Sequence, residues 1–284
     1  MATLRDIKRR IRSVQNTRQI TRAMEMVAAA KLRRAQSQVE KSRPYTQKMQ
    51  LILDNLSAAS GIVTHPFFEK RDVKNTTLVV ITSDRGFCGS FNNNVIRQAE
   101  AFLKAPAHQT AELVCVGKKG FTYFKKRRWD IVLSQIDYGG NLDLAKVRRL
   151  SSELTRRFLT GETDEIFLLF TRFISMSRHK VILERFLNIE HVADGDGSID
   201  YIFEPDPAAI YNDLMPRFAM TKVQTALADS FASEHAARMV AMSAATKNAG
   251  EMIDNLILVR NKARQAAITK ELLDIVGGAE ALHG

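Results

Sequence analysis

Apolar residues recur at helical spacing in two long segments, one near each end of the chain. The first segment covers residues 4–57 and the second covers residues 217–276. The apolar stripe of the first segment starts with Leu4, Ile7, Ile11 and Val14 and continues through Ile20, Met24 and Val27. Spacings of three and four residues are typical of helices that pack along a narrow stripe. Because a helix rises about 1.5 Å per residue, the segments predict helices about 80–90 Å long, more than a compact core needs.

Proline, alanine and the width of the apolar stripe refine the prediction for both helices. Pro44 removes a backbone hydrogen bond, so we expect the first helix to bend there. Ala28, Ala29 and Ala30 allow a second helix to approach closely. Neither segment has a second broad apolar face, which predicts that each helix packs chiefly against the other. We therefore expect the two ends of the chain to form an antiparallel coiled coil.

Short apolar runs alternate with helical stretches between the two long segments. Strands are expected at residues 78–82, 113–116, 131–134, 165–173 and 180–186, and helices at residues 94–103, 118–125 and 142–159. This alternation predicts an α/β head domain, Rossmann-like with a largely parallel sheet, inserted between the two long terminal helices. The expected division is an N-terminal coiled-coil helix at 1–57, the head domain at 58–208 and a C-terminal coiled-coil helix at 209–284.

Positive charge is concentrated in the first fifty residues. These contain thirteen Lys or Arg and three Asp or Glu, within a chain whose net charge is +11. Residues 217–284 contain eight basic and seven acidic residues, so the middle of the chain is neutral. A strongly basic helix predicts an acidic partner surface, with nucleic acid, anionic lipid and acidic protein as the candidates.

Signals for nucleotide, metal or membrane chemistry are weak. The chain contains neither GxGxxG nor GxxxxGK[ST], and the nearest imitation is GKKG at residues 117–120. No apolar run has the length of a transmembrane helix. Cys88 and Cys115 lack metal-ligand spacing, and the six histidines are dispersed. We therefore expect a reducing compartment, no structural zinc, no cofactor, and histidines that lie at the surface or in loops.

The loop SDRGFCGSFN at residues 83–92 follows an expected strand and raises the question of catalysis. Cys88 with Asp84 suggests a nucleophile, but no histidine is close in sequence, and a nucleophile needs a base within reach. Two glycines and the asparagines are more simply explained by a tight strand-to-helix turn with side-chain caps. We expect a structural turn. The open alternative is a catalytic Cys88 whose base comes from a distant part of the sequence.

The basic first helix also fits a nucleic-acid-binding coiled coil, and the α/β block also fits a dinucleotide enzyme. Single-strand binders stack bases on aromatic side chains, yet Tyr45 is the only aromatic residue among the first sixty. An Arg-rich start is also typical of a mitochondrial transit peptide, but the pattern continues well beyond any plausible cleavage point. The residues alone therefore predict a basic helical hairpin with an α/β head, which fits a mechanical or scaffolding part better than an enzyme.

Three separated segments carry a specific resemblance to a known family. They are residues 7–36, IKRRIRSVQNTRQITRAMEMVAAAKLRRAQ, residues 83–92, and residues 236–281, which include ARMVAMSAATKNAGEMI and NKARQAAITKEL. These segments resemble the gamma subunits of F-type ATP synthases, of the bacterial type. Phe87 and Ser90 depart from the family's SDRGLCGGFN, and the resemblance otherwise follows the whole chain in the same order.

The resemblance implies a central rotor shaft that performs no bond chemistry. One copy would occupy a ring of three alpha and three beta subunits, with the head beside the epsilon subunit and on the membrane-embedded c-ring. Ion flow through the c-ring would turn the shaft and drive ATP synthesis at the beta subunits, and the shaft would contribute to regulation of ATPase activity and proton flow. The resemblance implies no nucleic acid partner, no direct membrane insertion, and a peripheral position at the cytoplasmic face of a bacterial inner membrane. The family-like sequence begins almost at Met1, so we expect a bacterial and not an organellar origin.

The resemblance also implies contact residues. Contacts with the beta levers and catch region are expected from Arg22, Met24, Glu25, Arg264, Gln265, Thr269 and Glu271. A collar bearing is expected from Leu272, Leu273, Ile275 and Val276. The c-ring and epsilon side is expected to include Tyr201 and Glu204. Spacing alone places Met24 in the coiled-coil core, and Arg264 and Tyr201 have the alternative roles of a solvated base and a strand residue packed on the head.

Overall fold

The computed structural model describes residues 3–59, 65–69, 71–189 and 207–283, and it divides into two compact units. The head unit spans residues 28–238, and the helical unit combines residues 1–27 with residues 239–284. The two long helices, α1 and α5, each contribute to both units. The domain division expected from the sequence follows helix ends and stays a prediction. Tyr201 and Glu204 lie outside the described residues.

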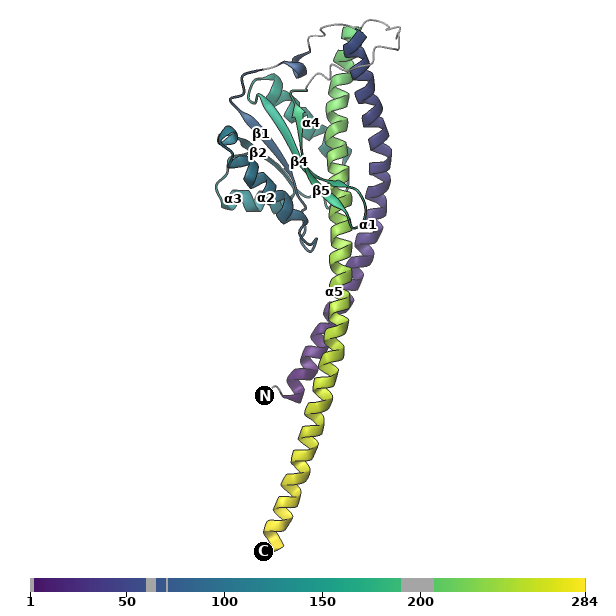
Figure 1. Ribbon diagram of the computed structural model, residues 1–284, viewed down its shortest axis with the longest axis vertical. Helices are drawn as coiled ribbons and strands as arrows, with labels where there is room; N and C mark the ends of the chain where they lie inside the picture. Colours follow the sequence, from purple (N-terminus) through teal and green to yellow (C-terminus); the bar gives the residue numbers. More distant parts are fainter. Residues whose placement is uncertain (1–2, 60–64, 70, 190–206, 284) are drawn as a thin grey trace. The chain divides into compact units, whose positions relative to one another are not determined.

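Strands and helices alternate along the chain in the order expected (Figure 1). The helices are α1 (Leu4–Ala59), α2 (Phe91–Leu103), α3 (Lys118–Lys126), α4 (Leu144–Leu159) and α5 (Pro207–His283), with short 3-10 helices η1 (Pro66–Phe68) and η2 (Pro106–His108). The strands are β1 (Thr76–Ile81), β2 (Glu112–Val116), β3 (Ile131–Gln135), β4 (Glu165–Phe173) and β5 (His179–Leu187). The predicted fold class, a largely parallel α/β sheet between two long terminal helices, is confirmed.

The five strands form one sheet in the order β3-β2-β1-β4-β5. The pairs β3–β2, β2–β1 and β1–β4 are parallel, and β5 runs antiparallel to β4. Every residue of the central strand β1 is buried, as expected for a parallel strand that is covered on both faces. Because β1 to β4 are parallel, their carboxyl ends meet at one edge of the sheet.

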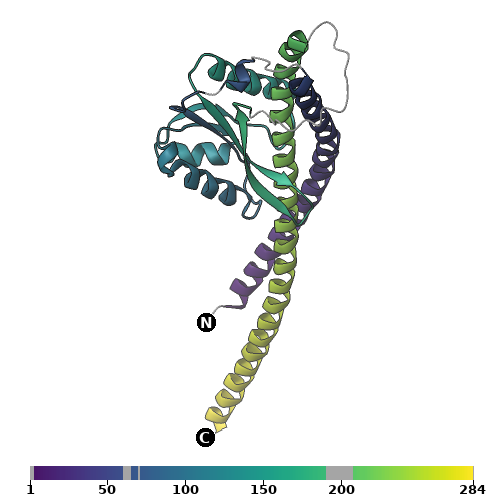
Figure 2. The same cartoon turned by 45° about the horizontal axis from the view of Figure 1, so that its top comes forward.

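Each face of the sheet has its own apolar core, and Figure 2 shows helices on both sides of the sheet. Val79 and Ile81 of β1 point to the face that packs against α4 and the head-unit part of α5. Leu78 and Val80 point to the opposite face, which α2 and α3 cover. The alternation follows from the two-residue period of a strand, which sends successive side chains to opposite faces.

Helix α5 belongs to the core of the head unit. The apolar cluster on the Val79 and Ile81 face of the sheet also contains four large side chains of this helix: Phe218, Val223, Leu227 and Phe231. All residues in the range 226–238 are buried, so the helix is covered on every side there. The expectation that each long helix packs chiefly against the other is therefore wrong for this part of α5. Alanine and serine at many of these positions give a weak stripe in the sequence, although the segment is buried all round.

Neither long helix ends at its proline. Helix α5 begins at Pro207, ten residues before the long apolar segment that starts at residue 217 and two residues before the expected division at 209, and it continues through Pro216. Met215 and Phe218 on either side of Pro216 are fully buried, so core packing outweighs the roughly 3 kcal/mol that a proline costs inside a helix. Helix α1 likewise continues through Pro44, and Met49 beyond it is buried.

In the helical unit the two helices run antiparallel. Thr246 Oγ1 donates a hydrogen bond to Thr21 Oγ1 (2.8 Å), and Gly250 lies beside the guanidinium of Arg18. The buried apolar side chains of this unit are Ile7, Ile11, Met242, Ala249 and Ile253. Rising residue numbers on α5 therefore meet falling numbers on α1, as the predicted antiparallel coiled coil requires.

The first prediction compares two leucines of the same helix. Leu227→Ala should lower the free energy of unfolding of the purified chain by about 2–5 kcal/mol, because it leaves a cavity in the core of the head unit. Leu272→Ala is the matched control: this side chain is 58% exposed, so its removal should change stability by less than about 0.5 kcal/mol. Urea unfolding of both variants measures the difference, and equal losses would show that α5 is not part of this core.

Candidate functional site

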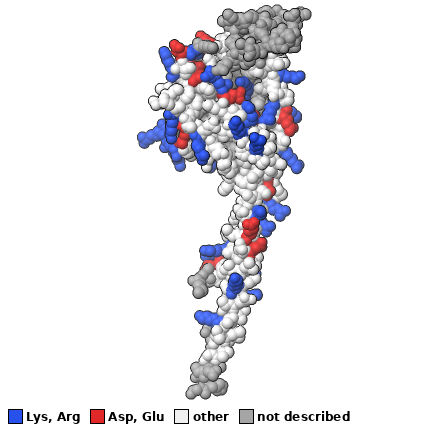
Figure 3. Space-filling model, viewed as in Figure 1, with Lys and Arg blue, Asp and Glu red and all other residues white. Residues whose placement is uncertain are grey.

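The last part of α5 has no packing partner among the described residues. Every described side chain from residue 264 to residue 278 is exposed. Five large apolar side chains lie in this stretch, each at least half exposed: Ile268, Leu272, Leu273, Ile275 and Val276. Figure 3 shows the end of this helix as a mostly uncharged surface. Contiguous exposed apolar side chains of this kind mark interaction sites in folded proteins, so this end of the helix is a candidate contact surface.

Polar residues precede the apolar end. Arg264, Gln265, Thr269 and Glu271 are all exposed. Gln265 and Thr269 are four residues apart and therefore share a helix face, which gives that face adjacent amide and hydroxyl groups. The sequence assigned this stretch to subunit contacts. The structure shows that these side chains are available, and the contacts themselves stay predictions.

Around Met24, the structure changes the register expected for α1. Thr21 is buried, whereas Ile20 and Val27 are 61% and 57% exposed. Met24 and Glu25 are half-buried and Arg22 is exposed. The prediction that Ile20 and Val27 belong to the coiled-coil stripe is therefore wrong, because the small, hydrogen-bonded Thr21 faces α5 instead. The exposed apolar side chains next to Met24 form a second candidate contact surface.

The two candidate contact surfaces lie at different heights of the helical unit. Thr21, close to Met24 on α1, contacts Thr246 on α5. Gln265 follows Thr246 by nineteen residues, which corresponds to roughly 28 Å along a helix. The sequence-predicted residues Arg22 to Glu25 and Arg264 to Glu271 are therefore not brought together, and a partner must reach them at separate places.

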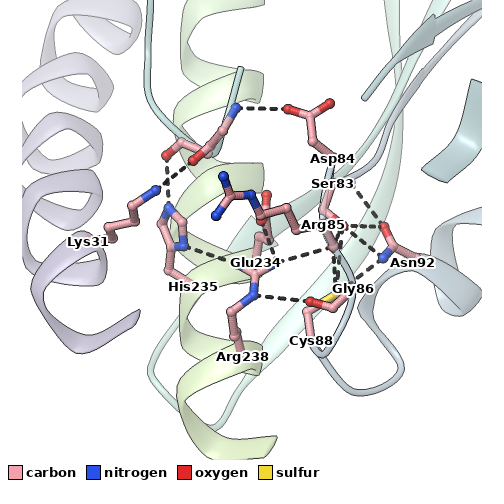
Figure 4. A network of polar contacts seen from close by, with 12 residues as sticks. Lys31, Ser83, Asp84, Arg85, Gly86, Cys88, Asn92, Glu234, His235 and Arg238 are labelled. Carbon is pink, nitrogen blue, oxygen red and sulfur yellow. Dashed lines mark hydrogen bonds and ion pairs between the residues drawn. The ribbon is translucent and has the colours of Figure 1, made fainter. Parts of the chain in front are cut away.

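A polar junction, buried on the α5 side and partly exposed elsewhere, holds helices α1 and α5 to two loops of the head unit (Figure 4). Lys31 Nζ of α1 donates to Gly139 O (2.9 Å), and the imidazole of His235 on α5 is 2.8 Å from Gly140 O. Asp84, in the loop after β1, accepts hydrogen bonds from the backbone amides of Lys118, Asp137 and Gly139. These contacts connect five segments that are far apart in sequence: α1, the loop after β1, the start of α3, the turn after β3 and α5.

Arg238 completes the junction on α5. Its Nε donates to Gly86 O and its Nη2 to Arg85 O, both at 3.2 Å. The same guanidinium forms a 2.7 Å ion pair with Glu234, and both side chains are at least nine-tenths buried. Burial raises the pKa of Glu234, although the charge of Arg238 acts in the opposite direction. Removing either partner of a buried charge pair strongly destabilises the folded protein, because the remaining charge is left buried without a partner.

His235 was expected at the surface or in a loop, and that expectation is wrong. It is 1% exposed, and burial lowers its pKa to about 4. Its Nε2 faces the carbonyl of Gly140, so this nitrogen carries the proton, and Nδ1 lies 3.3 Å from Arg238 Nη1. The neutral imidazole thus donates at one nitrogen and accepts at the other. The sequence carried one signal: Glu234, His235 and Arg238 cluster in an otherwise alanine-rich stretch.

The loop at residues 83–92 is a structural turn, as expected. Asn92 at the start of α2 accepts hydrogen bonds from the backbone amide and hydroxyl of Ser83, and its amide donates to Cys88 Sγ (3.2 Å). Cys88 is buried, and burial raises the pKa of its thiol, which disfavours the reactive thiolate. The described residues hold no group of three or more His, Cys, Asp or Glu placed to bind a metal ion.

Comparisons with known proteins match this chain almost from end to end. A family model described as ATP synthase matches residues 3–282. The ATP synthase gamma chain of Protochlamydia amoebophila is 44% identical over 284 residues, covering 99% of this chain and 100% of that protein. The gamma chain of Moorella thermoacetica is 48% identical over 282 residues, with the same coverage.

Two solved structures have a similar fold. A chain of the central stalk and c-ring of the Tetrahymena thermophila mitochondrial ATP synthase superposes with a TM-score of 0.62 at 26% identity, covering 80% of this chain and 99% of that one. A chain of the Euglena gracilis mitochondrial ATP synthase superposes with a TM-score of 0.72 at 21% identity, covering 99% and 94%.

An α/β head between two long helices, with an unpartnered helix end, defines a non-catalytic subunit of a larger machine. The chain belongs to the ATP synthase gamma chain family. Its function is that of the rotor shaft, and it carries no bond chemistry of its own.

The second prediction concerns pH and His235. An unfolded histidine titrates near pH 6.5, whereas His235 in the folded chain stays neutral down to about pH 4. The stabilising contribution of the neutral imidazole is therefore complete above about pH 6.5 and is lost as the pH falls from about 6.5 to about 4. Urea unfolding of the wild-type chain and of His235→Gln across this range should show a shallower loss of stability in the variant. Glu234, Arg238 and Lys31 are present in both chains and cancel in the comparison. Parallel pH profiles would contradict the prediction.

Proposed function

We propose that one copy of this chain forms the central shaft of an F-type ATP synthase, inside a ring of three alpha and three beta subunits. The head would contact the epsilon subunit and the c-ring, so that ion flow turns the shaft and drives ATP synthesis or, in reverse, hydrolysis drives ion pumping. The observation that carries the proposal is the exposed end of α5, where residues 264–278 have polar and apolar side chains free for partners.

The mechanism rests on the asymmetry of a single shaft among three equivalent partners. One shaft cannot contact three beta subunits identically, so each rotational position favours a different conformation at each catalytic site. A ligand or partner shifts an equilibrium only by its differential affinity for the two states. Rotation and nucleotide affinity are therefore linked by a coupling free energy, which acts in both directions between the shaft and the sites.

Charge on α1 supports contacts with acidic segments of the ring. The exposed basic residues in the helical-unit part of this helix are Arg5, Lys8, Arg9, Arg10, Arg12, Arg18 and Arg22. The one ion pair that involves them within the described part of the chain joins Arg9 to Asp6. Exposed ion pairs typically contribute less than about 1 kcal/mol each. Weak contacts suit a surface that must be broken and remade at every step, because a deeply buried hot spot would hold the shaft in place.

The two candidate contact surfaces would serve different parts of the ring. Arg22, Met24 and Glu25 would meet the beta levers, with exposed Ile20 and Val27 beside them. The polar stretch Arg264, Gln265, Thr269 and Glu271 would meet the beta catch region. The apolar end, with Leu272, Leu273, Ile275 and Val276, would turn in the collar of the ring. These side chains have no hydrogen-bonding groups, so their contacts would not hold the helix at one rotational angle.

The membrane side of the machine belongs to the proposal as well. Tyr201 and Glu204, outside the described residues, would contribute contacts to the c-ring and epsilon subunit. In the described part of the chain, no helix combines the length and apolarity needed to cross a membrane. We place the chain at the cytoplasmic face of a bacterial inner membrane, peripherally and as part of the complex.

Reconstitution tests the proposed function directly. Alpha and beta subunits of the same source, co-expressed with this chain, should give a complex of three alpha, three beta and one copy of the chain by native mass spectrometry. Its ATPase activity should depend on the chain. A chain that stays unassembled but binds DNA at physiological salt would overturn the proposal in favour of a nucleic-acid-binding coiled coil, whose affinity falls steeply with added salt.

A further prediction tests the proposed contact between Gln265 and the beta catch region. Gln265→Leu should lower the ATPase activity of the assembled complex, because it removes hydrogen-bonding groups from an exposed position and leaves the fold unchanged. A single exposed hydrogen bond is worth about 1 kcal/mol, so the loss should be several-fold. Asn255→Leu is the matched control, an exposed amide on the same helix that the family resemblance does not assign to contacts. Equal turnover in the wild-type and Gln265→Leu complexes would remove Gln265 from the contact surface.

A further inference from the structure

The turn that follows β3 touches both long helices at once. Gly139 and Gly140 have φ of +59° and +72°, a backbone conformation that glycine adopts without strain. The carbonyl of Gly139 accepts from Lys31 on α1, and the carbonyl of Gly140 faces His235 on α5. The amide of Gly139 donates to Asp84 Oδ2 (2.8 Å), which ties the turn to the loop after β1. All of these residues lie in the head unit.

Gly140 lies directly against α5. A Cβ atom at this position would come within 2.5 Å of Cε1 and Nε2 of His235. Contacts that short do not occur, so any side chain here would push the turn and the helix apart. Gly139, one residue earlier, has open space around the corresponding position. The requirement for glycine at 140 is therefore set by the helix as well as by the backbone conformation.

The same part of α5 is held to the other loops at the carboxyl edge of the sheet. Arg238 donates to the carbonyls of Arg85 and Gly86 after β1. Further back along the helix, Asp229 accepts from the amide of Phe173 at the end of β4 (3.3 Å) and from Arg43 of α1 (2.6 Å). Helix α5 is thus bonded to the segments after β1 and β3 and to the end of β4.

These bonds differ physically from the apolar packing around them. Burial of apolar area is non-directional, so by itself it does not set the angular position of a helix on the sheet. Hydrogen bonds weaken steeply when their angle changes, and those to charged groups are stronger than those between neutral groups. Bonds from Lys31, His235 and Arg238 to fixed carbonyls therefore resist rotation of the helices relative to the sheet.

We propose that the turn at residues 138–141, with Lys31, Asp84, His235 and Arg238, is a torsional clamp that locks α1 and α5 to the head sheet so that torque passes between them without slack. The inference rests on the proposed function, since only a rotating shaft needs this stiffness. The clamp makes Gly140 and His235 positioning residues for rotary coupling, and neither touches a nucleotide.

The test measures angular stiffness in the assembled complex. The beta subunits are fixed to a surface and a rotation probe is attached to the head, and the angular spread of the probe is recorded while the enzyme pauses. Gly140→Ala should raise the angular variance roughly two-fold, because relief of the clash with His235 breaks the hydrogen bonds of the turn. Gly161→Ala is the matched control: its φ is +75°, but the added Cβ meets nothing within 4 Å. It carries the same backbone strain and should leave the variance unchanged.

A milder variant guards against misfolding. Lys31→Met keeps the aliphatic stem and removes the ammonium that binds Gly139 O, so it should also broaden the angular spread, while Lys31→Arg should restore a narrow one. If Gly140→Ala and Lys31→Met lower the melting temperature but leave the angular variance at the wild-type value, the junction is merely structural and the clamp is wrong. If the wild-type complex fails to assemble or rotate, the proposed function fails instead, so the two failures are distinguishable.

Discussion

The structure depends on one helix laid across the carboxyl edge of a parallel sheet. In open α/β folds this edge, at the point where the strand order reverses, is where ligands bind. Here the strand order reverses between β1 and β4, and α5 is hydrogen-bonded to the loop after β1 and to the end of β4. Asp229, Ser233 and Arg238 bond to the segments that follow the strands or to the strand ends themselves. These bonds fix α5 to strands and loops on both sides of the switch point, so a Rossmann-like sheet is firmly joined to a long helix.

Helix α5 is buried and hydrogen-bonded in the head unit but exposed at its end in the helical unit. In the head unit the helix is buried on every side and is held by directional hydrogen bonds and a buried ion pair with Glu234. In the helical unit its last described residues are exposed and have neither kind of contact within the described part of the chain. A shaft needs both properties, because the end joined to the head must not slip and the end inside the ring must not stick.

Family resemblance in the sequence pointed to the exposed end of α5, whose contacts stay predictions, but not to the bonds that attach the long helices to the head sheet. The residues assigned from segments similar to the family are exposed in the structure: Arg264, Gln265, Thr269, Glu271, Leu272, Leu273, Ile275 and Val276. His235 and Gly140 were missed, because their importance comes from a contact between residues 95 positions apart. Ile20 and Val27 were assigned to the wrong face of α1, since a helical stripe does not reveal that the smaller Thr21 packs against α5.

The sequence by itself determined the long helices, the five strands and the order of elements, because spacing of apolar residues is a local property that each segment carries alone. It also determined the family, through three long segments. Only the tertiary structure decided that residues 226–238 are buried all round, and that Lys31, Asp84 and His235 meet at one glycine turn. The physical reason is that burial and directional polar contacts depend on which surfaces the fold brings together, and residues that meet in this way leave no periodic pattern in the chain.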